Sequence, residues 1–292
     1  MNKYISILTG ILFLYACNRN GNNADAYGSF EADEIIVSAE SNGKLLSFNV
    51  EEGMNLKKGE VVGEIDSEAV YLQLKQLMTQ KELVASKLNQ INAQKDIYQS
   101  QMDIVKTEKN RVEKLFKDGA ATQKQMDDVS GQFNVLNNQL HLVNTQLQTV
   151  QKELKGIDVQ AEILELNLDK CKITNPVNAM VVERYVEPHE LVNMGKSLYK
   201  IATMNKIFLK AYVSEPQLST FLVGDTATVY CDGENDSKKS FKGVVTWISS
   251  KAEFTPKVVQ TEEERVNLVY AVKIEVENDG TLKIGMPGEV KF

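Results

Sequence analysis

Apolar residues recur with a seven-residue period through the middle of the chain, from Val70 to Cys171. In the downstream run they are spaced alternately by three and four residues, and all fourteen are Met, Val, Phe, Leu, Ile, Ala or Cys: 126, 129, 133, 136, 140, 143, 147, 150, 154, 157, 161, 164, 168 and 171. In the upstream run Val, Leu, Ile or Tyr returns every seven residues from Val70 to Val112. A strict heptad repeat of this length predicts two helices that pair as a coiled coil.

The upstream helix has a second seam position at which apolar residues alternate with lysines. Its members are Leu74, Lys81, Leu88, Lys95, Met102, Lys109 and Phe116. We expect the lysine stems to cover the seam while the ammonium groups reach water. The alternative is that these lysines face neighbouring hairpins in an oligomer.

Signals for a helix end and a helix start stand close together between the two runs. Asp118-Gly119 predicts the end of the first helix, since glycine takes the left-handed conformation easily. Thr122 and Gln125 fit the S/T-x-x-E/Q capping box that opens a helix. A connection this short makes the helices antiparallel neighbours. Each arm has about 48 residues, so the sequence predicts a rod roughly 70 Å long.

The regions on either side of the rod form an internal repeat. Residues 38–65 align with residues 174–201 at a constant offset of 136, and identities include Asn42 with Asn178 and Gly59 with Gly195. Each half alternates short β-branched runs with turn residues, which is typical of short strands. Neither half has enough apolar side chains for a core of its own. We therefore expect one small β-sandwich built from both halves, with the hairpin inserted between them.

After Met204 the chain again reads as short strands separated by turns such as Gly224-Asp225 and Asp232-Gly233. An antiparallel barrel is the arrangement that leaves no open edge. The expected fold class is thus an elongated multidomain α+β protein: an antiparallel coiled-coil α-hairpin in a split β-sandwich, followed by an antiparallel β-barrel.

The first seventeen residues carry one lysine, a short apolar run and then Ala16-Cys17. The run is too short to cross a bilayer and predicts a secretory signal. A small residue before Cys17, with Leu14 three residues earlier, resembles a bacterial lipoprotein signal, so we expect Cys17 to be lipidated. The alternative is an ordinary signal peptide with an incidental cysteine. The polar segment after Cys17 predicts a flexible linker.

Charge and residue composition narrow the kinds of function and site that the sequence allows. A net charge of −7 argues against nucleic-acid binding. We expect Cys171 and Cys231 to be buried free thiols, with a single bridge as the alternative. His141 and His189 are far apart without further ligands at metal spacing, and no phosphate-binding loop is present. We therefore expect no metal, no cofactor and no catalytic residues, so the protein is not predicted to be an enzyme.

The segment "VEEGMNLKKGEVVGEID" resembles half of a biotinyl/lipoyl carrier domain. Split by a helical hairpin, such a domain resembles the HlyD-type membrane fusion proteins, and residues 252–278 with the closing "GMPGEVKF" are similar to the YbhG-like branch. The second half departs from the usual A-P-x-D-G-x-V, reading Asn175 to Val181 as "NPVNAMV", and His189 replaces the usual glycine. We expect altered turn geometry at these positions.

The resemblance implies domain boundaries and a reduced or absent membrane-proximal part. The expected segments are the lipoprotein signal peptide 1–17, linker 18–29, lipoyl-like halves 30–67 and 173–203, coiled-coil hairpin 68–172 with its tip at about 117–122, and β-barrel 204–292. A strand from residues 28–37 is the only further contribution that we expect to a membrane-proximal domain.

The resemblance also implies partners. In this family the hairpin tip meets a TolC-like outer-membrane channel through the pattern R-x-x-x-L-x-x-x-x-x-x-S, which Arg111, Leu115 and Thr122 match with Thr in place of Ser. Gly119 and Ala120 lie between them in the expected contact. Arg111 would fork onto carbonyls or carboxylates, Leu115 would supply an apolar anchor, and Thr122 would cap the second helix. The alternative explanation requires no partner. In it Thr122 serves only to cap the second helix, and Leu115 covers the last turn of its own hairpin.

The function implied is that of a periplasmic adaptor anchored to the inner membrane by its lipid. It would link an inner-membrane transporter to the outer-membrane channel for efflux of small molecules. The resemblance to the YbhG-like branch implies that this transporter is an ABC exporter. Copies of the chain would assemble as a trimer or hexamer. One alternative is the adaptor of a proton-driven RND pump, and a more distant one is a periplasmic coiled-coil scaffold that never meets a channel.

Overall fold

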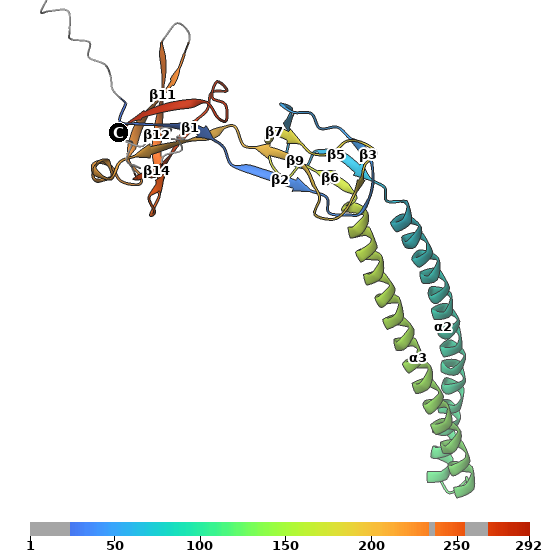
Figure 1. Ribbon diagram of the computed structural model, residues 1–292. Helices are drawn as coiled ribbons and strands as arrows, with labels where there is room; N and C mark the ends of the chain where they lie inside the picture. Colours follow the sequence, from blue (N-terminus) through green and yellow to red (C-terminus); the bar gives the residue numbers. More distant parts are fainter. Residues whose placement is uncertain (1–23, 234–236, 255–267) are drawn as a thin grey trace, which may run out of the picture.

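The computed structural model describes residues 24–233, 237–254 and 268–292. The expected signal peptide with Cys17, residues 18–23 of the expected linker and residues 255–267 of the 252–278 segment lie outside the described residues. The molecule is elongated, with a barrel at one end, a β-sandwich in the middle and a helical hairpin at the other end (Figure 1).

The sandwich takes strands from both sides of the hairpin. One sheet has the order β2-β9-β7-β4 and the other β6-β5-β3-β8, so each contains two strands from each half. The strands of the first half recur 136 residues later, β3 as β7, β4 as β8 and β5 as β9. Their bounds are β2 Glu34–Ser38, β3 Gly43–Phe48, β4 Asn55–Leu56, β5 Val61–Ile65, β6 Lys172–Thr174, β7 Ala179–Arg184, β8 Leu191–Val192 and β9 Ser197–Ala202.

Hydrogen bonds between the halves are exchanged in symmetric pairs. The side-chain oxygen of Asn178 accepts from the backbone N–H of Lys58 at 2.8 Å, and Asn42 accepts from Met194 at 2.7 Å. Each half thus closes a turn of the other. The two halves also share one core, in which Leu45, Val50, Leu56, Val62, Ile65, Val181, Val186, Val192, Leu198 and Ile201 are at most 2 % exposed. The predicted split sandwich is confirmed.

The expected change of turn geometry is wrong at His189. Its backbone has φ 73°, the left-handed conformation that Gly53 holds with φ 83° at the equivalent turn. The sheet fixes this geometry, because the N–H of His189 donates to the carbonyl of Leu45 at 2.7 Å, as the N–H of Gly53 donates to that of Val181 at 2.9 Å. His189 therefore carries backbone strain that a glycine would not.

Asn175, at the usual alanine position, is 1 % exposed and its amide donates to the carbonyl of Lys57 at 3.2 Å. Its side-chain oxygen accepts from the hydroxyl of Tyr199 at 3.2 Å. Burial of this ring raises the pKa of Tyr199 to about 12. Asn175, in place of the usual alanine, thus gives the buried hydroxyl of Tyr199 a hydrogen-bond partner.

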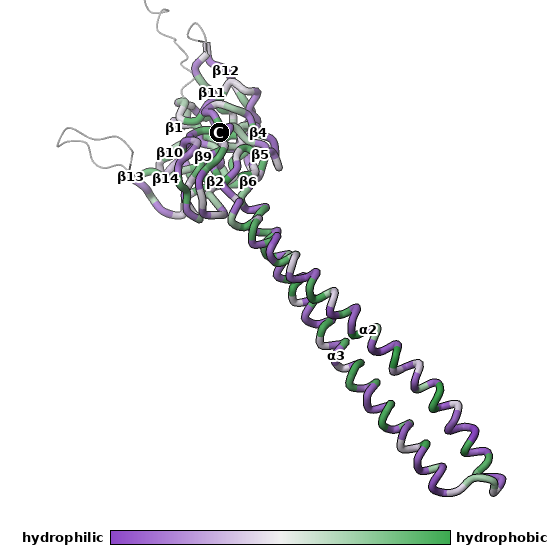
Figure 2. The backbone as a smooth tube through the Cα atoms, turned by 90° about the vertical axis from the view of Figure 1, so that its right-hand side faces the viewer, coloured by the Kyte–Doolittle hydropathy of each residue, from purple (hydrophilic) through white to green (hydrophobic). Residues whose placement is uncertain are grey.

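The hairpin consists of α2 (Glu68–Lys117) and α3 (Gln123–Asp169), of 50 and 47 residues. Their lengths correspond to about 75 Å. All fourteen heptad positions of the downstream run are buried or partly buried. Figure 2 shows hydrophobic segments recurring along both helices between hydrophilic ones. The predicted antiparallel coiled coil is confirmed.

Two of the three seam lysines have partners within their own hairpin. Lys81 forms an ion pair with Asp158 of α3 at 2.7 Å, and its side chain is 43 % exposed. The ammonium group of Lys109 lies 4.3 Å from the centre of the Phe133 ring. These contacts agree with lysines that cover the seam and still reach water.

The barrel has six strands in the order β10-β1-β15-β11-β12-β14 and closes through pairing of β10 with β14, while β13 adds to β14. Its bounds are β1 Ala26–Glu31, β10 Lys206–Val213, β11 Thr226–Asp232, β12 Lys238–Ile248, β13 Glu253–Phe254, β14 Leu268–Glu277 and β15 Pro287–Lys291, with a 3-10 helix η2 at Glu215–Thr220.

Strand β1 belongs to this barrel, although the expected boundaries divide its residues between the linker 18–29 and the lipoyl-like half 30–67. β1 pairs with β10 and β15, and its Phe30 is fully buried in the barrel core. The alternation of buried residues in this short strand was too brief to separate it from the polar residues before it. The barrel is therefore built from both ends of the chain, not from residues 204–292 alone.

Both described cysteines are free and buried, Cys171 in the sandwich core and Cys231 in the barrel core. Since they belong to different cores, the alternative of a bridge between them is wrong.

Replacing Val150, which is 3 % exposed in the seam, with Asp should lower the free energy of unfolding of the hairpin by about 3 kcal/mol or more, because an unpaired carboxylate would be buried. Val159 is 48 % exposed on the same helix, so Val159→Asp should change it by less than about 0.5 kcal/mol. Thermal and urea denaturation followed by far-UV circular dichroism would measure both. Equal losses would contradict the seam assignment.

His189→Gly should stabilise the sandwich by roughly 0.5–1 kcal/mol, because relief of the left-handed strain exceeds the added freedom of the unfolded chain. Gly53→Ala is the matched change at the equivalent turn. No atom lies within 4 Å of the added Cβ, so strain alone should cost roughly 1 kcal/mol. Urea denaturation would compare the two variants with the parent chain, and a destabilised His189→Gly protein would show that the turn is not strained.

Candidate functional site at the hairpin tip

Helix α2 ends in a turn that its backbone closes by itself. Asp118 is the C-cap, and Gly119 follows in the left-handed conformation with φ 72°. The N–H of Gly119 donates to the carbonyl of Phe116 at 3.1 Å, and the N–H of Ala120 donates to that of Leu115 at 2.7 Å. This pair of bonds is a Schellman motif, so Gly119 and Ala120 have a structural role without any partner.

Helix α3 begins with the predicted capping box. The hydroxyl oxygen of Thr122 accepts from the N–H of Gln125 at 3.3 Å, and the Gln125 side-chain oxygen accepts from the N–H of Thr122 at 2.8 Å. The capping role of Thr122 is confirmed. The tip is consequently a short turn whose backbone N–H groups have hydrogen-bond partners, and it holds the ends of both helices in place.

Three side chains near this turn face solvent. Arg111 is 69 % exposed, and one of its guanidinium nitrogens donates to the carboxylate of Glu108 at 2.6 Å. This hydrogen bond raises the pKa of Arg111, so the group stays cationic. Leu115 is 41 % exposed and Phe116 is 39 % exposed. Exposed arginine and aromatic side chains are enriched in protein interfaces.

Phe116 was missed as a site residue because the heptad pattern assigns it to the seam. The helix ends one residue later, at Lys117, so the seam is open to solvent at this position. An apolar seam residue in the last turn of a helix was the available signal. The structure therefore places Arg111, Leu115, Phe116, Gly119, Ala120 and Thr122 together at one end of the rod.

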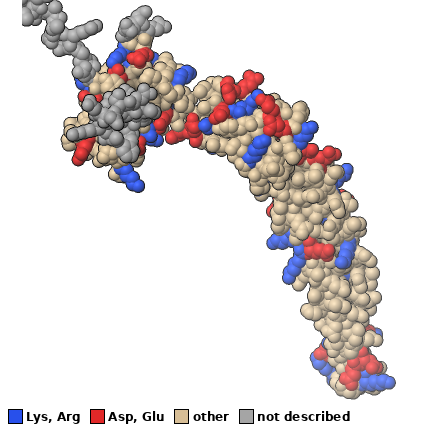
Figure 3. Space-filling model, in the orientation of Figure 1, with Lys and Arg blue, Asp and Glu red and all other residues tan. Residues whose placement is uncertain are grey.

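The tip carries charges of both signs around these side chains. Lys117 forms an ion pair with Glu113 at 3.3 Å. Figure 3 shows acidic and basic side chains gathered at the far end of the rod. Such an end is suited to docking against another protein, with polar groups at the rim of a small apolar centre. Within residues 24–233, 237–254 and 268–292 no group of three or more His, Cys, Asp or Glu residues is placed to hold a metal ion.

Comparison with known proteins covers almost the whole chain. No family model matches. The UPF0194 membrane protein YbhG of Salmonella agona is 27% identical over 313 residues, which cover 99% of this chain and 94% of that protein. The corresponding protein of Salmonella arizonae matches to the same extent.

Two solved structures share the fold. The alignment with MacA from Actinobacillus actinomycetemcomitans has a TM-score of 0.63 and 23% identity, and covers 93% of this chain and 79% of that one. The membrane fusion protein Spr0693 from Streptococcus pneumoniae aligns with a TM-score of 0.51 and 15% identity over 91% of this chain and 96% of that one. Among the described residues no helix combines the length and apolar character needed to cross a bilayer. The chain is a homologue of YbhG and has the fold of the HlyD-type membrane fusion proteins.

Proposed function

We propose that this chain is a periplasmic adaptor that links an inner-membrane exporter to a TolC-like outer-membrane channel for efflux of small molecules. The observation that carries the proposal is an exposed docking tip, with Arg111, Leu115 and Phe116, at the end of a rod of about 75 Å. The β domains lie at the opposite end (Figure 1). A molecule of this shape contacts different partners with its two ends.

The tip would bind by docking and not by chemistry on a substrate. Arg111 would place its guanidinium fork on carbonyls or carboxylates at helix ends of the channel. Leu115 and Phe116 would bury their exposed apolar surface in the same contact. Gly119, Ala120 and Thr122 would hold the turn in shape. The role of the protein would be assembly and sealing, without a catalytic step.

Copies of the chain would surround a common axis as a trimer or hexamer. Each tip then needs only a modest contact, because linked copies bind the channel together. A lipid on Cys17 would hold the assembly at the inner membrane, on the periplasmic side.

The inner-membrane partner that we propose is an ABC exporter, as the resemblance of residues 252–278 and the closing "GMPGEVKF" to the YbhG-like branch implies. Affinity purification of the intact envelope complex followed by mass spectrometry should recover an ATPase with its permease and an outer-membrane channel. Recovery of a large proton-driven RND pump would select that alternative. Recovery of neither transporter nor channel would favour a coiled-coil scaffold.

The double variant Arg111→Asp/Leu115→Asp should abolish export while the hairpin keeps its helicity, because both side chains are exposed and neither belongs to the seam. Resistance to exported compounds in cells would measure function, and circular dichroism would measure folding.

A control carries comparable changes away from the tip, with a cation and a leucine each replaced by aspartate. Lys106 and Leu72 are exposed on α2, nearer to the sandwich. Lys106→Asp/Leu72→Asp should therefore leave export within about twofold of the parent, as surface changes away from contacts cost little. Normal export by the tip variant would rule out docking through this surface.

A further inference from the structure

The barrel carries an exposed apolar turn between η2 and β11. The chain from Pro216 to Gly224 contains no charged residue. Within it Leu222 is 72 % exposed and Val223 is 59 % exposed. Apolar side chains scattered singly over a surface are ordinary, but these two are consecutive and stand at the tip of one turn. Residues 221–225 are here termed the apolar turn.

Hydrogen bonds hold the backbone of the apolar turn in one shape. The N–H of Leu222 donates to the carboxylate of Asp225 at 2.8 Å, and the N–H of Asp225 donates to the carbonyl of Leu222 at 3.2 Å. The N–H of Gly224 donates to the carbonyl of Val245 in β12 at 2.8 Å. The turn is thus fastened to itself and to the barrel, and its two apolar side chains are held outward.

The N-terminal segment joins the barrel beside this turn. The carbonyl of Asp25 accepts from the side-chain amide of Gln217 at 2.5 Å, and its carboxylate accepts from the N–H of Phe292 at 3.0 Å. The Phe292 ring stacks on that of Phe221, the first residue of the apolar turn, with centroids 3.8 Å apart. The C-terminus is marked at the end of the barrel that lies away from the sandwich (Figure 1). The apolar turn and the entry of the chain therefore share that end.

The position of Cys17 brings this end of the barrel close to a membrane. Asp25 follows Cys17 by eight positions, and eight residues span at most about 28 Å. A lipid on Cys17 would thus keep the apolar turn within that distance of the bilayer surface. Tethering at one point does not fix the direction in which the rod points, whereas a second contact at the barrel would. Stable anchoring of a protein to a bilayer commonly combines two such signals.

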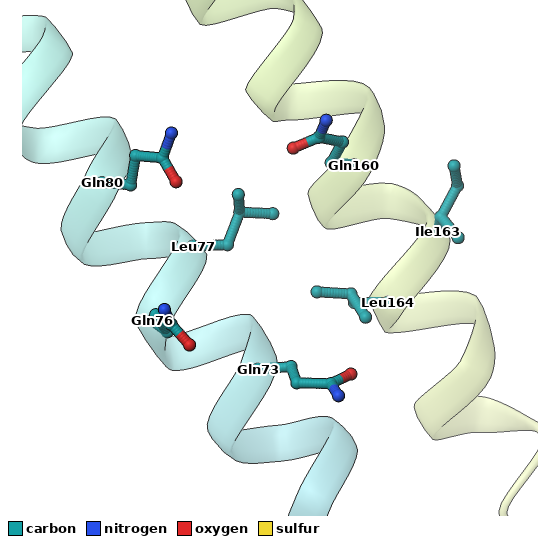
Figure 4. Close-up of a pocket in the computed structure, with 7 residues that line it drawn as sticks. All are labelled: Gln73, Gln76, Leu77, Gln80, Gln160, Ile163 and Leu164. Atoms are coloured by element: carbon teal, nitrogen blue, oxygen red, sulfur yellow. The ribbon is translucent and has the colours of Figure 1, made fainter.

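The apolar turn suits a bilayer better than another exposed apolar surface of the molecule does. Near the sandwich Leu77, Ile163 and Leu164 line a hollow between α2 and α3, together with four glutamine side chains (Figure 4). Those amides would lose their hydrogen bonds to water in hydrocarbon. Leu222 and Val223 bring no polar side chain, and the N–H groups described above already have partners, as a lipid environment requires.

We propose that the apolar turn inserts Leu222 and Val223 into the periplasmic leaflet of the inner membrane, beside the lipid on Cys17. The inference rests on the lipid anchor of the proposed function. The charged residues nearest to the turn along the chain, Glu215 and Asp225, are both acidic. The contact is therefore with the apolar part of the lipid and does not depend on anionic headgroups. With this end held at the membrane, the sandwich and the hairpin extend away from it (Figure 1).

Probe fluorescence tests the insertion in the full-length chain, purified in detergent and reconstituted into phosphatidylcholine vesicles. The fluorophore NBD attached to L222C should emit at shorter wavelength than in water and be quenched by spin-labelled lipids. Added phosphatidylglycerol should not change this result. The parent chain treated with the same reagent corrects for labelling of Cys171 and Cys231, which are buried.

The matched control places the same probe at the other end of the barrel. Lys283 is exposed in the loop after Asn278, whose N–H donates to the carbonyl of Asn205, next to the sandwich. K283C carries the same lipid anchor, so its probe should stay in water. Equal quenching at the two sites, no quenching at position 222, or quenching only with phosphatidylglycerol would overturn the proposal. A chain that does not float with the vesicles would overturn it together with the lipid anchor.

A second variant tests whether the turn itself drives insertion. V223D in the L222C chain should lower the inserted fraction about tenfold or more, because a carboxylate would have to enter the bilayer. V159D makes the same change at a residue that is 48 % exposed on α3, and should leave insertion unchanged. Equal insertion in the two variants would refute a role for the turn.

The vesicles contain neither a transporter nor a channel, so this measurement is separate from the test of the proposed function. If affinity purification recovers neither partner while the probe at position 222 is quenched, the adaptor role fails and the membrane contact stands. If both partners are recovered while the probe stays in water, the insertion alone is refuted, and the apolar turn is then assigned to a protein partner.

Discussion

The exchange of strands and turn contacts between two distant halves of the chain is the constraint on which the rest of the molecule depends. Asn42 and Asn178 each accept a hydrogen bond from a turn in the opposite half, and each sheet needs strands from both. Neither half can satisfy its backbone or bury its apolar side chains alone. The sandwich therefore forms as one unit, and forming it brings residues 65 and 172 together.

This closure sets the direction of the rod. The N–H of Ile65 donates to the carbonyl of Cys171 at 2.8 Å, so the last strand before α2 and the first after α3 are adjacent. Two helices that leave and return at neighbouring points are held antiparallel from their first turn. The heptad seam then carries that alignment to the tip, where the backbone closes the turn without help from a partner.

Because the seam side chains pack against each other within the hairpin, the side chains on its outer surface are available to contact other molecules. Arg111, Leu115 and Phe116 are exposed at the end of the rod. In the proposed function this end meets a channel.

The sequence by itself determined the local and periodic features: the heptad runs, the capping box at Thr122, and the repeat at an offset of 136 that located the sandwich halves. These depend on patterns along one segment, so they can be read without coordinates. The tertiary structure decided what depends on distant partners. β1 joined the barrel because β10 and β15 complete its pairing, and His189 kept a left-handed backbone because Leu45 holds its N–H. Phe116 became exposed because the seam ends beside it, which no repeat along the chain can indicate.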